Sequence, residues 1–235
     1  MDDMREMERL CSADIIWTQR FISLPNRQYT IEWMGRVLVA ADSAILFLAV
    51  ELLDQYLGRY QVARDRLQHL AIACINLAWK AVEDELPPTL SQWSERSKGH
   101  CTPGQLFDME VAVATGLGFK LEYPTVINFL RCTAGVPDET AAVARRILEL
   151  SLLAPCGPQF RPSQRAAVAI SIAQNLIRGF GPDDGTIAPE LAPCRRWLTA
   201  IMRSQGSPRW LDKIYETALL AGPSRAPRQK ENVED

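Results

Sequence analysis

The residue types that most often perform chemistry in proteins are few in this chain, and their spacing matches no common catalytic or metal site. Only two histidines occur, His69 and His100, and although His100 adjoins Cys101, no second close cysteine or histidine pair completes a zinc site. The six cysteines contain no C-x-x-C pair, so we expect reduced thiols. The pattern predicts no metal and no cofactor.

The glycine pairs and the acidic turn also lack the setting that an enzyme needs. Gly116 and Gly118, like Gly179 and Gly181, follow no predicted strand, so neither pair is a nucleotide-binding fingerprint. Asp183-Asp184-Gly185 lacks the ligand spacing of a calcium loop and is typical of a turn. No nucleophile, base and orienting group occur together. We therefore expect a protein that is not an enzyme.

The stretch RLQHLAIACINLAWK, residues 66–80, is the helix around which we expect the rest of the chain to pack. Its apolar residues leave almost no polar side on a helix, so other helices must surround it. It is shorter than the roughly 20 residues that span a bilayer, and Gln68, His69 and Asn76 interrupt it. Lys80 closes the run, where a cation suits the C-terminal end of the helix dipole.

Helical periodicity continues along the rest of the chain, and no alternating apolar and polar run competes with it. The predicted fold class is therefore all-α. The alanine-rich run LAIACINLA near residue 74 has an echo, AAVAISIAQ, near residue 170, which indicates two copies of one helical unit. The central helix is predicted to begin at about Val62, and Asp138 is predicted to cap a helix that runs to about Leu153. The other predicted helices are 3–22, 29–41, 44–57, 89–97, 103–117, 126–131, 190–203 and 207–220.

Composition and charge exclude several classes of protein. The 235 residues are 47% apolar and 23% charged, which is typical of a globular protein. A net charge of −2, with no long basic run, gives no field that attracts nucleic acid or an anionic membrane. The start, MDDMREMERLCSADIIW, lacks the order of a secretory signal, so we expect an intracellular protein.

Two five-helix units after an N-terminal helix resemble the cyclins, and three segments support the resemblance. LAVELLDQYL (48–57) resembles the second helix of the first cyclin box, RLQHLAIACINLAWK its third, and MEVAVATGLGFKLEYPTVINFL (109–130) its fifth helix running into the second box. The resemblance implies tandem five-helix cyclin boxes. The expected division is an N-terminal helix and linker (1–25), a first box (26–122), a second box (123–221) and a disordered tail (222–235).

The resemblance also implies a partner and a binding site. Cyclins hold a cyclin-dependent protein kinase through a lysine that ends the third helix and a glutamate in the fifth, which are Lys80 and Glu110 here. An aromatic residue after the fifth helix adds apolar contact, and Phe119 matches it. The implied function is a non-catalytic kinase activator that promotes cell-cycle progression in the nucleus or cytoplasm. The plainer interpretation of Lys80 and Glu110 is a pair of solvated, dipole-favouring charges.

A second implied site is a patch by which some cyclins recruit kinase substrates. The positions that match it are Arg27, Trp33 and Gln68, although core packing would equally explain Trp33. The positions where its apolar residues are replaced are Asn26, Tyr29 and Thr30. One turn after the tryptophan, where such cyclins have an acidic residue, this chain has Arg36, which should repel cationic docking peptides. The patch is therefore expected to have lost its usual ligand.

Within the family, DRLQHLAIAC (65–74) is most similar to the run SRLQLLGATC of D-type cyclins. The Leu-x-Cys-x-Glu motif of that type is absent, and Ala81 stands where many cyclins place a bulky apolar residue. A compact, divergent, D-like chain resembles a herpesvirus-encoded cyclin, which would act on a host kinase. The alternative is a cyclin-fold adaptor or transcription-factor-like scaffold that activates no kinase.

Overall fold

The computed structural model describes residues 19–39, 41–154, 160–185 and 187–204, and these contain helices and no strand. The prediction of an all-α protein is confirmed. In chain order the elements are α2 (Leu24–Val37), α3 (Ser43–Leu57), η2 (Arg64–Arg66), α4 (Leu67–Val82), α5 (Leu90–Arg96), α6 (Pro103–Gly116), α7 (Val126–Cys132), α8 (Asp138–Leu153), α9 (Pro162–Ile177), η3 (Pro189–Leu191) and α10 (Ala192–Ser204).

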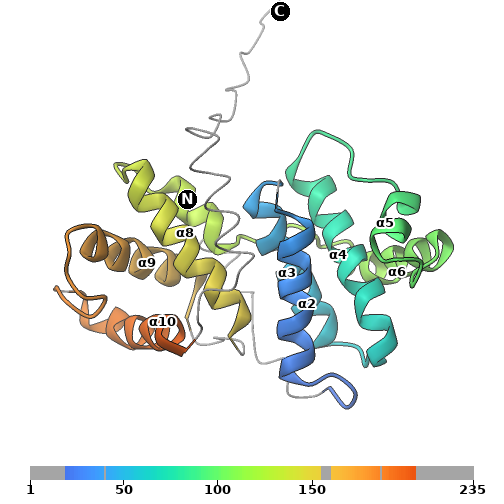
Figure 1. The fold of residues 1–235 in the computed structure, drawn as a ribbon, viewed down its shortest axis with the longest axis horizontal. Helices are drawn as coiled ribbons and strands as arrows, with labels where there is room; N and C mark the ends of the chain where they lie inside the picture. The colour runs from blue at the N-terminus through green and yellow to red at the C-terminus, as the bar shows by residue number, and fades with distance from the viewer. Residues whose placement is uncertain (1–18, 40, 155–159, 186, 205–235) are drawn as a thin grey trace, which may run out of the picture.

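The helices form two groups that follow the order of the chain. Figure 1 shows α2 to α6, the N-terminal group, on one side and α8 to α10 on the other. Helix α7 packs against α8 and α9, so α7 to α10 form the C-terminal group. The two groups meet where α2 and α3 contact α8 and where α3 contacts α7.

An alanine-rich helix lies at the centre of each group. In the N-terminal group α4 packs against α2, α3 and α6, and every residue from Leu70 to Ala78 is buried. In the C-terminal group α9 packs against α7, α8 and α10. Small side chains along both helices let their neighbours approach closely, which explains why one compositional pattern occurs twice.

Capping residues set several helix starts where they were predicted. The Thr89 side chain accepts a hydrogen bond from the backbone N–H of Gln92, and the Gln92 side-chain oxygen accepts one from the backbone N–H of Thr89. Helix α5 begins at the residue after Thr89. Thr102 and Gln105 open α6 in the same way. Each capping box satisfies two backbone N–H groups that a helix end otherwise leaves unpaired.

Three predicted helix starts differ from the structure. Helix α2 begins at Leu24, before the predicted residue 29, because Ser23 is its cap and Pro25 lies in its first turn, where proline is tolerated. Helix α4 begins at Leu67 after the short turn η2, and not near Val62. Asp138 is the first residue of α8 and not its cap.

The predicted helix over residues 3–22 lies almost wholly outside the described residues, as do the helix over 207–220 and the tail over 222–235. Residues 19–22 are described and are not helical. The side chain of Gln19 donates hydrogen bonds to the carbonyl oxygens of Leu57 and Tyr60, the second at 2.6 Å, and accepts one from the backbone of Val62. This segment is thereby fixed against the end of α3.

The described part of the chain contains neither a candidate membrane-spanning helix nor a candidate metal-binding cluster. No helix there combines the length and the hydropathy that crossing a bilayer requires. Within the same residues, no three histidine, cysteine, aspartate or glutamate side chains lie close enough to hold a metal ion. The cysteines Cys74, Cys101, Cys132 and Cys194 are free thiols.

Glu149 is a buried carboxylate in the C-terminal group. Its side chain in α8 is 1% exposed, and its Oε2 has no hydrogen-bond partner among the described residues. Burial raises the pKa of Glu149 to about 7, against the lowering effect of Arg145 and Arg146. Glu149 binds its proton more tightly in the folded protein than in the unfolded chain. Its contribution to the free energy of unfolding is therefore fully present below pH 4.5 and is lost as the pH rises through about 7.

We expect Glu149→Gln to remove this loss of stability. Relative to wild type, the free energy of unfolding of the variant should rise by on the order of 3 kcal/mol between pH 4.5 and 7, and then stay level. Urea denaturation at a series of pH values measures the difference. A difference between the two proteins that does not change with pH would contradict this account.

Candidate functional site

Lys80 and Glu110 lie side by side at the surface, on the two neighbouring helices α4 and α6. The Nζ of Lys80 forms an ion pair with Oε1 of Glu110. The Lys80 side chain is 48% exposed and that of Glu110 is 14% exposed, so the lysine presents its ammonium to solvent while the carboxylate is held at the protein surface. Packing of α4 against α6 brings together two charges that are 30 residues apart in the chain.

Asn76 holds the second oxygen of the same carboxylate. Its Nδ2 donates a hydrogen bond of 2.5 Å to Oε2 of Glu110. Asn76 precedes Lys80 by four residues in α4, so both side chains lie on one face of the helix. Because both oxygens have a donor, the carboxylate has a fixed orientation. In the sequence Asn76 interrupts an apolar run. The sequence feature that indicates a part in the site is its position one helical turn before Lys80.

Apolar side chains are exposed on the same part of α6. Phe107 and Val111 are 58% and 46% exposed and stand one turn apart, on either side of Glu110 in the sequence. Leu86, in the segment after α4, is 89% exposed. Single exposed apolar residues are ordinary, but two of them one turn apart on the helix that carries Glu110 are typical of a protein-binding surface.

Phe119 lies beyond the C-terminal end of α6, and its side chain is 71% exposed. Gly118 and Phe119 both have left-handed backbones, with φ of 62° and 58°. This turn is closed by a 2.7 Å hydrogen bond from the Phe119 N–H to the carbonyl oxygen of Ala114. A left-handed backbone is costly for a residue with a bulky side chain, so the fold holds this ring outside the core at a cost in strain.

A small cleft lies beside Ala81, near the end of α4. Its volume is about 210 Å³, and its walls include Ala44 of α3, Tyr123 and Pro124 before α7, and Asn128 of α7. The methyl group of Ala81 fills little of this space. A bulky residue at position 81 would occupy the cleft itself, whereas alanine leaves room for a side chain of a bound partner.

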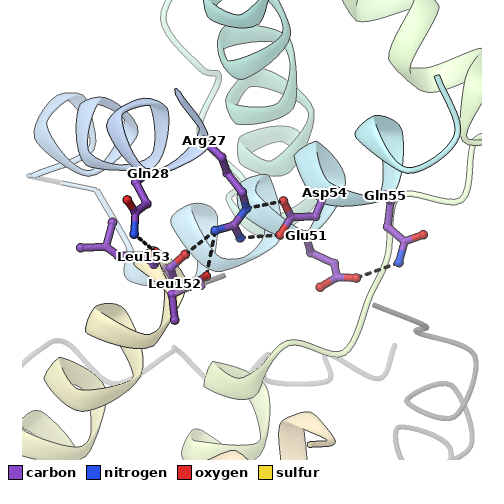
Figure 2. A network of polar contacts seen from close by, with 8 residues as sticks. Arg27, Gln28, Glu51, Asp54, Gln55, Leu152 and Leu153 are labelled. Atoms are coloured by element: carbon purple, nitrogen blue, oxygen red, sulfur yellow. Dashed lines mark hydrogen bonds and ion pairs between the residues drawn. The ribbon is translucent and has the colours of Figure 1, made fainter. Parts of the chain in front are cut away.

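Arg27 is buried and connects the two helix groups (Figure 2). Its guanidinium pairs with the carboxylate of Asp54 in α3, through Nε at 2.8 Å and Nη2 at 2.6 Å. Its Nη1 donates to the carbonyl oxygens of Leu152 and Ala154 at the end of α8, at 2.9 and 3.2 Å. These carbonyls have no partner within their own helix, and a cation there also complements the helix dipole.

Two further residues extend this network (Figure 2). Gln28 donates a 2.9 Å hydrogen bond to the carbonyl oxygen of Leu153, the last residue of α8. Gln55 donates a hydrogen bond of 3.0 Å to Glu51. Burial raises the pKa of Glu51 above its ordinary value, and the hydrogen bond from Gln55 offsets only part of this rise. The end of α8 is therefore capped by side chains from α2.

The three residues of the predicted docking patch do not all line one surface. Trp33 and Gln68 line an open groove between α2, α4 and the end of α5. Arg27 does not line it, because its side chain is only 3% exposed and points toward Asp54 and α8. Trp33 also packs partly against the core.

Comparisons with known proteins agree with this architecture. The family model described as cyclin, N-terminal domain, matches residues 1–122. The G2/mitotic-specific cyclin-B of Dictyostelium discoideum is 30% identical over 185 residues, which cover 76% of this chain and 42% of that protein. The corresponding cyclin-B of Arbacia punctulata is 31% identical over 178 residues, covering 73% and 43%. The chain thus spans less than half the length of these relatives.

A solved structure has the same fold over nearly the whole chain. The X-ray structure of a viral cyclin from herpesvirus saimiri superposes with a TM-score of 0.67 and covers 94% of this chain and 98% of its own, at 19% sequence identity. Identity at that level shows the shared fold alone. The family model, which covers more than half of the 235 residues, shows the family. This chain belongs to the cyclin family.

Proposed function

We propose that this cyclin is a regulatory subunit that binds and activates a cyclin-dependent protein kinase, thereby promoting cell-cycle progression, and that it performs no catalysis itself. The observation that carries the proposal is the ion pair of Lys80 and Glu110 at the surface, with exposed Phe107 and Val111 beside it. A surface of this composition offers both apolar burial and charged hydrogen-bonding groups to a partner.

The charge pair keeps unused hydrogen-bonding capacity for a kinase. An ammonium has three donors, of which Lys80 gives one to Glu110, and each carboxylate oxygen accepts more than one hydrogen bond. Carbonyl and N–H groups of a kinase segment can therefore be bound without breaking the pair. Phe119 would add apolar contact, and the cleft beside Ala81 would receive a side chain of the kinase.

Activation follows if the surface prefers one arrangement of the kinase. A cyclin that binds the active position of a regulatory helix more tightly than the inactive position shifts the kinase population toward the active one. The shift equals the ratio of the two affinities, and a ratio of about 10⁴ converts a mostly inactive population into a mostly active one. Because both oxygens of Glu110 are already held, little orienting entropy remains to be lost on binding.

Purification of the tagged chain from cell lysate tests the proposal. The expected result is a co-purified protein kinase, identified by mass, whose activity toward a peptide substrate rises when the pure chain is added to the pure kinase. A kinase that binds without a rise in activity would favour the adaptor function. Purification of no kinase at all would contradict the assignment of the surface.

The variant Asn76→Leu tests whether Asn76 supports kinase binding by orienting Glu110 and not by stabilising the fold. The substitution removes the hydrogen bond to Glu110, and it also removes the buried Oδ1 of Asn76, to which no described residue donates a hydrogen bond. We expect affinity for the co-purified kinase to fall about tenfold, or ~1.4 kcal/mol, without a fall in melting temperature. Titration calorimetry and thermal unfolding measure the two effects. Unchanged kinase affinity would remove Asn76 from the site.

Further features of the function stay predictions. We propose two cyclin boxes, 26–122 and 123–221, and the grouping of the helices around α4 and around α9 supports this division. D-type character, a herpesvirus origin, action on a host kinase and a nuclear or cytoplasmic location rest on the sequence resemblance. The relatives compared above are mitotic B-type cyclins, so the run DRLQHLAIAC alone supports the D-type character.

A further inference from the structure

The groove that Trp33 and Gln68 line is open and has a volume of about 710 Å³. Aromatic and aliphatic side chains, Tyr29, Trp33 and Leu67, contribute apolar surface to it from α2 and α4. Tyr29 is 67% exposed although it is surrounded by partly buried residues. The volume falls in the range that suits a few side chains of a bound segment.

Cations line this groove and carboxylates do not. Arg64, Arg96 and Lys98 are all exposed and belong to its wall, together with His100, whereas no aspartate or glutamate does. No ion pair to these three cations occurs in the parts of the chain that the structure describes. In a chain with a net charge of −2, this is a local concentration of positive charge.

The carboxylates nearest in sequence are exposed and lie outside the groove. Asp65 and Glu95 each adjoin one of the cations in the chain, but neither side chain lines the cavity. A further cation, Arg36, lies 5.7 Å above the ring of Tyr29. The field inside the groove is therefore set by cations on several elements.

An aromatic ring positions the Arg96 guanidinium, and a hydrogen-bonded turn positions the backbone at Lys98. The guanidinium of Arg96 lies 5.0 Å above the ring of the buried Trp93. Lys98 follows in a turn with a left-handed φ of 56°, and buried Ser97 ties that turn by accepting a 3.2 Å hydrogen bond from the backbone of Cys101. Pre-organised charges lose less entropy on binding than mobile ones.

We propose that this groove binds an extended acidic peptide segment of a partner protein. Aspartate or glutamate side chains of the segment pair with Arg64, Arg96 and Lys98, and an apolar side chain between them packs on Trp33. This charge preference is the reverse of a docking site for cationic peptides. A peptide is the occupant rather than a nucleic acid, because the negative chain as a whole repels a polyanion at long range.

Selection from a random peptide library, with the whole chain immobilised, tests the proposal. We expect the selected peptides to be enriched in aspartate and glutamate around an apolar residue. Fluorescence anisotropy of the most enriched peptide then compares wild type with Arg64→Glu and with Lys98→Glu. Each reversal should weaken binding about tenfold at low salt, and added salt should weaken wild-type binding.

Arg178→Glu is the matched control, because it makes the same change of charge at an exposed position of the C-terminal group. It should bind the peptide as wild type does, and circular dichroism should show all the variants folded. Enrichment of cationic peptides, absence of any enrichment, equal binding by Arg64→Glu, or displacement of the peptide by a short single-stranded oligonucleotide at equal concentration would each overturn the proposal. No kinase is present, so the result is independent of the proposed function.

Discussion

The double variant Lys80→Glu/Glu110→Ala is expected to lose the co-purifying protein kinase activity. The substitutions reverse one charge of the candidate site and remove the other, so that kinase groups buried against them are left unpaired. Loss of such charged contacts typically costs about 2 to 5 kcal/mol, which is roughly 30-fold or more in affinity. A pull-down from cell lysate, followed by a kinase assay, measures the loss.

The fold should tolerate these substitutions. The Lys80 side chain is 48% exposed, and an ion pair of that exposure contributes at most about 1 kcal/mol to stability. Loss of the Glu110 acceptor for the buried Nδ2 of Asn76 adds a cost of about 1 to 3 kcal/mol. Arg203→Glu/Asp183→Ala is a matched control, because it changes another exposed ion pair, at the end of α10, in the same way. Kinase activity should stay with the control and leave with the test variant. Equal activity in both would refute the assignment of the site.

Asp54→Ala is expected to lower the free energy of unfolding by about 3 to 5 kcal/mol. The substitution removes the Asp54 carboxylate from the guanidinium of Arg27, which is buried at 3% exposure. The carbonyl oxygens of Leu152 and Ala154 still accept from Arg27, which places the expected loss toward the lower value. Urea denaturation at neutral pH measures it.

Two comparisons separate the buried charge from the loss of a contact. Asp183→Ala breaks an ion pair whose side chains are 70% and 47% exposed, and it should cost less than about 1 kcal/mol. Arg27→Met/Asp54→Leu removes both charges of the pair, and it should be more stable than Asp54→Ala alone because it removes the buried guanidinium together with the Asp54 carboxylate. If Asp54→Ala and Asp183→Ala are destabilised equally, the buried network does not contribute as described.

Local features of the chain were predictable because their causes are local. Thr89 and Gln92, or Thr102 and Gln105, are three residues apart and determine where a helix begins whatever packs around it. Because α4 is apolar around almost its whole circumference, other helices must cover it on all sides. The start of α2 at Leu24 lies before the predicted residue 29, because Pro25 stands in the first turn, where a proline gives up no intrahelical hydrogen bond.

Long-range features were less predictable because they depend on packing. The resemblance to cyclins indicated Lys80 and Glu110 but not Asn76, whose contact with Glu110 joins two helices that are distant in the sequence. Arg27 was assigned to a surface patch, and nothing near it in the chain indicates that its partners include carbonyl oxygens 125 and 127 residues away. The cationic character of the groove likewise appears only when α5 packs beside α2 and α4.

The position of Arg27 also has a consequence for how the chain matures on the ribosome. Asp54 is synthesised soon after Arg27, whereas the carbonyl oxygens at the end of α8 follow 125 and 127 residues later. A nascent chain that has folded its earlier helices therefore carries a guanidinium that lacks these two carbonyl acceptors, and water must solvate it there until α8 docks. Docking of α8 exchanges that water for the two carbonyl groups, and a product truncated before residue 152 would never make this exchange.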